Sequence, residues 1–97
     1  MLELKARKLH MVIGFVQDKD LNAVLPLFPT DAKYYFCRPD LPRGLDENVL
    51  KEKAAVFGLE GFAYPAVKKA YDDALLNAGS DDVVFIGGST FVVAEVL

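Results

Sequence analysis

The chain has 97 residues, of which 53% are hydrophobic and 26% are charged, and its formal net charge at pH 7 is −3. This length and composition predict one small folded domain and exclude a disordered chain. The acidic balance excludes the broad basic surface with which proteins bind nucleic acid or anionic membranes.

A single cysteine, Cys37, excludes an internal disulfide and is typical of a reducing compartment. Residues 1–5 lack the apolar core of a signal peptide, and no apolar run approaches the length of a membrane span. We therefore expect a cytoplasmic protein.

Apolar runs alternate with amphipathic segments along the chain, which is typical of a parallel β-sheet covered by helices. The first strand is predicted at 9–16, whose nearly continuous hydrophobicity suits a strand buried on both faces. A helix should follow, kinked or shortened at Pro26, because that residue lacks a backbone N–H donor. Its apolar residues recur at helical spacing: Leu21, Val24, Leu25 and Phe28.

A second strand is predicted at 32–37, and a loop with two prolines and two arginines follows at 38–44. The next helix should have Asp46 as its N-cap and should end at Gly58. Three of its residues are predicted to face inward: Leu50, Ala54 and Phe57.

The last third of the chain predicts a short strand at 61–64, a helix, and a buried fourth strand at 83–86. Pro65 is placed in the first turn of that helix, which should end at Gly79. The helix carries an apolar stripe of Val67, Ala70, Tyr71, Ala74, Leu75 and Ala78. Residues 91–97 are assigned to a terminal helix with Ser89 as its N-cap. The predicted fold is α/β, a Rossmann-like three-layer domain with a mainly parallel sheet.

Ligands of open parallel sheets bind outside the carboxyl ends of the strands, and this rule selects the segments 17–20, 38–44 and 87–90. In the last segment, Gly88 can adopt a positive φ and expose backbone N–H groups, while Ser89 and Thr90 add hydroxyls. Lys19 or Arg43 would supply positive charge. Together these groups predict a site for a carboxylate or a phosphate.

Several motifs are missing from the sequence: a P-loop, a Gly-x-Gly-x-x-Gly turn, a Cys/His metal cluster and a nucleophile–base pair. His10 begins the first strand, at the end of the sheet opposite the predicted ligand edge, and is interpreted as structural. Cys37 is interpreted as a small buried residue without a reactive role. An alternative interpretation makes Asp18 and Asp20 an ordinary helix-start cluster, and Ser89 as an N-cap is compatible with Ser89 as a ligand contact.

Three segments together resemble the C-terminal domain of the folylpolyglutamate synthase/dihydrofolate synthase family, which belongs to the Mur ligase superfamily. The first is 9–20, which ends in Asp18-Lys19-Asp20. The second is Arg43-Gly44-Leu45. The third is 85–97, which contains Gly87-Gly88-Ser89-Thr90.

This resemblance implies an ATP-dependent ligase that joins L-glutamate to dihydropteroate or folate through an acyl phosphate. It implies that ATP and Mg²⁺ are bound mainly by an N-terminal P-loop domain of the same parent chain, over which this domain closes. It places Lys19 and Ser89 at the carboxylates of the incoming glutamate and makes Arg43 a phosphate or carboxylate contact. Asp18 and Asp20 would orient Lys19 or cap the following helix.

The sequence departs from that family at its start, because relatives begin this domain with a strand that ends in an Asp-x-x-His-Asn-type motif. Nothing of the kind precedes Leu9. We therefore expect 1–97 to be one domain excised from a larger ligase and inactive without its N-terminal domain, with 1–8 the end of a preceding helix. Two alternatives stay open: a stand-alone Rossmann-type module that binds nucleotides or anions, and a domain that docks on a larger partner.

Overall fold

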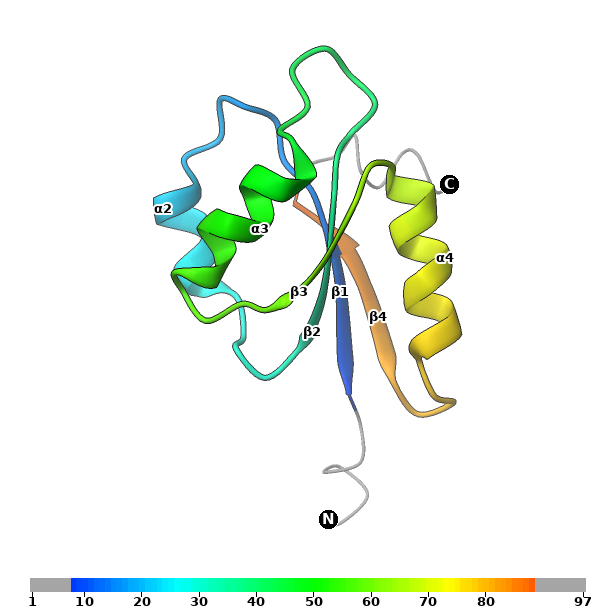
Figure 1. Cartoon of the computed structure of the whole chain (residues 1–97). Helices are drawn as coiled ribbons and strands as arrows, with labels where there is room; N and C mark the ends of the chain where they lie inside the picture. Colours follow the sequence, from blue (N-terminus) through cyan, green and yellow to red (C-terminus); the bar gives the residue numbers. More distant parts are fainter. Residues whose placement is uncertain (1–7, 89–97) are drawn as a thin grey trace.

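The computed structural model describes residues 8–88, which form a four-stranded sheet between two layers of helices (Figure 1). This arrangement confirms the predicted α/β, Rossmann-like three-layer fold. The expectations for residues 1–7 and for the helix at 91–97 lie outside the described residues. The elements in chain order are β1 (Leu9–Ile13), α2 (Leu21–Val24), the 3-10 helix η1 (Leu25–Leu27), β2 (Lys33–Cys37), α3 (Glu47–Ala55), β3 (Gly61–Tyr64), α4 (Val67–Asn77) and β4 (Val83–Gly87).

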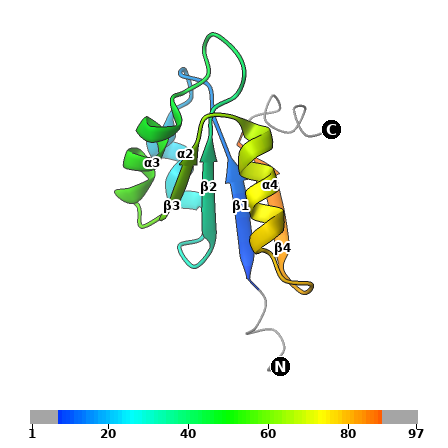
Figure 2. The same cartoon turned by 45° about the vertical axis from the view of Figure 1, so that its right-hand side comes forward.

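The strands lie in the order β3-β2-β1-β4, and each neighbouring pair is parallel. The chain moves outward from β1 to β3, and α4 then carries it back across the sheet to β4 on the other side of β1. Because parallel crossovers are right-handed, this reversal places α4 on the face opposite α2 and α3 (Figure 2). The strand order therefore reverses between β1 and β4, where open α/β sheets bind their ligands.

Alternate residues of the central strands supply the two cores. On one face, Met11 and Ile13 pack with Leu25 and with Leu50 and Ala54 of α3. On the other face, the buried residues come from β1, β2 and α4: Val12, Tyr35, Cys37, Val67, Ala70 and Ala74. Burial on both faces explains why the sequence of β1 reads as a continuous apolar run.

Two local predictions about helices are confirmed. The Asp46 carboxylate accepts hydrogen bonds from the backbone N–H groups of Asn48 (2.9 Å) and Val49 (3.2 Å), so it caps α3. Pro26 lies in the first turn of η1, where the α-helical hydrogen-bond pattern of α2 has already given way to a 3-10 turn.

Four details of the prediction are wrong. The first strand ends at Ile13, not at residue 16. Pro65 precedes α4, whose N-cap is Ala66, and Leu75 of that helix is 48% exposed. The fourth strand is not buried on both faces, since Val83 and Phe85 are each 44% exposed. Strand β4 lies at the edge of the described sheet, and α3 packs over β2 and β3 instead.

Candidate functional site

Two of the three predicted ligand segments are joined by backbone hydrogen bonds at the carboxyl end of the sheet. The Gln17 N–H donates to the Arg43 carbonyl (2.8 Å), and the Leu45 N–H donates to the Phe15 carbonyl (2.8 Å). Val16 and Gly44 form an antiparallel bridge between them. Segments 17–20 and 38–44 therefore form one connected surface.

Gly88, in the third segment, lies against the same region. A Cβ atom added to Gly88 would lie 2.3 Å from the Gly14 carbonyl oxygen, and the φ of Gly88 is +100°. A glycine is thus required here by backbone packing between the ends of β4 and β1. Ser89 and Thr90, the other predicted ligand groups of this segment, lie outside the described residues.

Asp18 and Arg43 form an ion pair between the two connected loops. The side chains are 66% and 64% exposed, so water screens the attraction between them. The sequence predicts that Asp18 orients Lys19 or caps the helix, and in the structure its carboxylate pairs with Arg43. Asp20 does occupy the N-cap position of α2, but its side chain makes no capping hydrogen bond.

Lys19 lines a cavity of about 240 Å³ at this edge. Within residues 8–88, its ammonium group forms no ion pair. Lys53, in the last turn of α3, lines the same cavity, so two cations from different elements face one space. The remaining lining residues are Gln17, Asp20, Leu21, Asn22 and Leu45. This cavity can accept an anionic group.

Lys53 was not predicted as a site residue, because in the sequence it looks like an ordinary lysine near the C-terminal end of a helix, where positive charge is favourable. The bridge between Val16 and Gly44 brings α3 close to 17–20, and no pattern in the local sequence predicts that bridge. A larger cavity of about 430 Å³ lies at the ends of β2 and β3 and includes Arg38 from the predicted loop. Its other lining residues are Pro39, Asp40, Leu41, Pro65 and Ala66.

His10 and Cys37 have structural partners, as interpreted from the sequence. His10 is buried, and its Nδ1 and Nε2 lie 2.9 Å from the Tyr35 hydroxyl and the Asp82 carboxylate. The buried Cys37 thiol donates to the Ile13 carbonyl (3.3 Å). His10 lies at the amino ends of the strands, away from Lys19.

The fold lowers the pKa of the Asp82 carboxylate. Hydrogen bonds from the Gly79 N–H, from His10 and from the Lys8 N–H lower the pKa of Asp82 from 3.8 to about 2. This perturbed group belongs to the amino end of the sheet with His10, so it supports the fold there and not the candidate site.

The described part of the chain contains no group of three or more His, Cys, Asp or Glu side chains that could hold a metal ion. It also contains no helix long and apolar enough to cross a membrane.

The chain is similar to known proteins over most of its length. Residues 1–90 match the family model described as Mur ligase, glutamate ligase domain. A Halobacterium salinarum protein named "Probable bifunctional folylpolyglutamate synthase/dihydropteroate synthase" is 37% identical over 92 residues, which are 91% of this chain and 11% of that protein. The Escherichia coli dihydrofolate synthase/folylpolyglutamate synthase is 31% identical over 87 residues, or 89% of this chain and 20% of its own length.

Solved structures agree with these matches. Escherichia coli FolC in complex with DHPP and ADP superposes with a TM-score of 0.83 at 28% identity, covering 97% of this chain and 23% of that one. The Yersinia pestis folylpolyglutamate synthase/dihydrofolate synthase complexed with AMPPNP and Mn ion gives a TM-score of 0.80 at 25% identity, covering 98% and 22%. The chain thus spans 11% to 20% of the length of these two curated relatives.

Proposed function

We propose a function from the premise that this chain belongs to the Mur ligase family, as a glutamate ligase domain. The chain is the glutamate-binding domain of an ATP-dependent ligase that joins L-glutamate to dihydropteroate or folate. The observation that carries this proposal is the family match over residues 1–90, together with similarity to folylpolyglutamate synthases across nine-tenths of the chain.

The carboxyl edge of the sheet supports a role in holding glutamate. Glutamate carries two carboxylates, and the cavity beside Lys19 and Lys53 offers two ammonium groups at the end of the sheet where α/β domains bind ligands. Asp20 lines the same cavity and would accept a hydrogen bond from the amino group of the substrate. Arg43, held near this edge by Asp18, is a further cation for a carboxylate or phosphate.

ATP and Mg²⁺ do not fit the described residues, which contain neither a P-loop nor a metal-ligand group. The proposal therefore assigns both to an N-terminal P-loop domain of the parent ligase. Related structures are complexed with AMPPNP and Mn, and one of them also with L-glutamate. The task proposed for this chain is to hold and orient the incoming amino acid.

A domain exchange tests the proposal. The matching 87-residue region of the Escherichia coli relative would be replaced by this chain, and glutamate-dependent phosphate release would be measured with a pteroate substrate. We expect turnover above that of the truncated Escherichia coli enzyme, and no turnover by this chain alone. A chimera that folds and binds ATP but shows no glutamate-dependent turnover would contradict the proposed function.

A further inference from the structure

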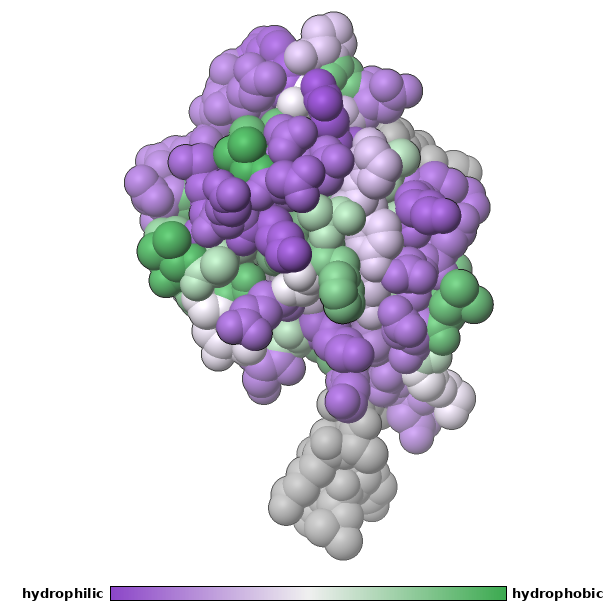
Figure 3. All heavy atoms as spheres, viewed as in Figure 1, coloured by the Kyte–Doolittle hydropathy of each residue, from purple (hydrophilic) through white to green (hydrophobic). Residues whose placement is uncertain are grey.

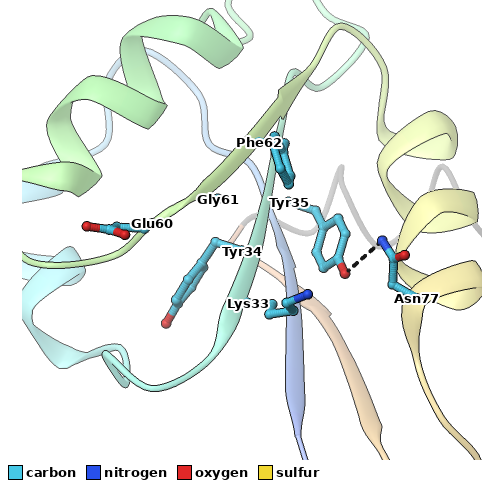
Figure 4. A pocket seen from close by; sticks show the side chains of 7 residues that line it. All are labelled: Lys33, Tyr34, Tyr35, Glu60, Gly61, Phe62 and Asn77. Carbon is cyan, nitrogen blue, oxygen red and sulfur yellow. Dashed lines mark hydrogen bonds between the residues drawn. The ribbon is translucent and has the colours of Figure 1, made fainter.

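A second cavity, of about 320 Å³, lies at the amino end of the sheet, far from Lys19 (Figure 4). It opens between the edge strand β3 and the last turn of α4. Its lining comes from two strands, β2 and β3, from the end of α4 and from the residue before β3: Lys33, Tyr34, Tyr35, Glu60, Gly61, Phe62 and Asn77. Nothing in the proposed ligase function uses this end of the domain.

Tyr35 is held rigidly at the floor of this cavity. Its hydroxyl lies 2.9 Å from His10 Nδ1 and accepts a hydrogen bond from the Asn77 amide (3.4 Å). Because the Asp82 carboxylate can only accept, His10 donates to it from Nε2, and in the neutral ring Nδ1 then accepts a hydrogen bond from the Tyr35 hydroxyl. The Tyr35 ring also stacks on Tyr64, with centroids 6.1 Å apart. The floor of the cavity is therefore formed before any ligand arrives.

Phe62 supplies an aromatic wall. It pairs with Tyr35 across β2 and β3, so the two rings lie on the same face of the sheet, yet Phe62 is 66% exposed. In Figure 3, hydrophobic residues gather at the centre of the view, over the strands between α3 and α4. An exposed phenyl ring beside a preformed polar floor offers a stacking surface to another flat ring.

Two side chains with N–H groups still able to donate, Lys33 and Asn77, meet beside the Tyr35 hydroxyl at one end of the cavity. Figure 4 shows the Lys33 amino group, the Tyr35 hydroxyl and the Asn77 amide close together below Phe62, whereas Glu60 points away. Lys33 forms no ion pair with residues 8–88. An ammonium group and an amide N–H beside a phenyl ring match a carboxylate attached to an aromatic ring.

We propose that this cavity binds a small aromatic carboxylate. The ring of the ligand stacks on Phe62, and its carboxylate receives hydrogen bonds from Lys33 Nζ and from the second N–H of the Asn77 amide. The cavity is separate from the proposed glutamate site, because the two lie at opposite ends of the strands and share no lining residue.

A ¹H–¹⁵N NMR titration of the full 97-residue chain with benzoate tests this assignment. We expect saturable shifts concentrated at 33–35, 60–62 and 77, with a dissociation constant on the order of 1 mM, as for other ligands of this size. Acetate lacks the ring and benzyl alcohol lacks the charge, so each should bind at least about fivefold more weakly. Shifts centred on Lys19, or no saturation at benzoate concentrations on the order of 10 mM, would overturn the proposal.

Variants separate specific binding from a general effect of charge. Lys33→Gln and Phe62→Thr should each weaken benzoate binding by about fivefold, because each removes one of the two recognition elements. Lys51→Gln removes the same charge from an exposed position on α3 and should leave the affinity unchanged. Melting temperatures would verify that each variant is folded. Equal benzoate affinity in wild type and both cavity variants would refute the site.

Discussion

The backbone of Gly14 occupies the space that a side chain at Gly88 would need, with only 2.3 Å between the added Cβ and the Gly14 carbonyl oxygen. The turn after β4 is thus shaped by β1 before any ligand is considered. From the sequence alone, Gly88 is expected for another reason, namely a positive φ that exposes backbone N–H groups to a ligand.

A Gly88→Ala substitution should lower the free energy of unfolding by about 1–3 kcal/mol, since the positive φ and the contact with Gly14 both oppose a side chain. Urea denaturation measures this loss. Gly79→Ala is the matched control, because its added Cβ would meet Asp82 only at an ordinary 3.7 Å. Equal stability of Gly88→Ala and wild type would show that the turn relaxes freely.

In the chimeric ligase, Lys19→Ala should raise the glutamate KM by about threefold to tenfold, as expected for one partly screened charge-assisted contact. The ATP KM should stay unchanged, because the proposal assigns ATP to the N-terminal domain. Lys69→Ala, an exposed charge deletion on α4, serves as the control. A change in the ATP KM alone would contradict the proposal that Lys19 contacts glutamate.

Asp82 should make the stability of the chain depend on pH. Its folded-state pKa, about 2, lies below the ordinary 3.8, so its contribution is present above about pH 4 and is lost as the pH falls toward 2. Asp82→Asn should therefore be less stable than wild type at pH 7, with a difference that shrinks between pH 4 and pH 2. Urea titrations at several pH values measure this, and a difference that does not change with pH would argue against the assignment.

Asp46→Ala should lower the free energy of unfolding by about 1 kcal/mol, because two backbone N–H groups of α3 lose their acceptor. Asp46→Ser keeps a capping oxygen and should recover most of that loss. Thermal and urea denaturation measure the stability of both variants. Equal losses of stability for Asp46→Ala and Asp46→Ser would show that the loss does not come from the missing capping oxygen.

The ion pair between Asp18 and Arg43 should contribute less than about 1 kcal/mol, since both side chains are mostly exposed. A double-mutant cycle with Asp18→Asn and Arg43→Gln measures the coupling, which should decrease further as salt is added. A large coupling that salt leaves unchanged would indicate a pair that is shielded from water.

The strands, the helices and their order along the chain could be predicted from the sequence, because each of these elements has a local signal. The apolar run of β1, the cap at Asp46 and the breaker at Pro26 act over a few residues. Exposure of Phe85 could not be predicted in this way, since an apolar run looks the same in a central strand and an edge strand.

In the candidate site, too, some features could be predicted from the sequence and others could not. The carboxyl-end rule selected segments that do lie together, as the hydrogen bond from Gln17 to Arg43 shows. The partner of Asp18 and the position of Lys53 depend on how two loops close against each other, and neither follows from spacing along the chain. The roles of Lys19, Ser89, Thr90 and Arg43 toward substrate stay predictions.

Strand β4, the last element described, pairs with β1, the first, and the Lys8 N–H donates to Asp82 across 74 positions of sequence. Closing so long a loop is entropically costly, and the sheet cannot form its β1–β4 pair until nearly all of the chain is available. During synthesis, the inner edge of β1 therefore stays uncovered until residues 83–87 leave the ribosome. We infer that this domain completes its folding late, as a cooperative unit, and that a chain shortened before Val83 would expose an apolar strand edge prone to aggregation.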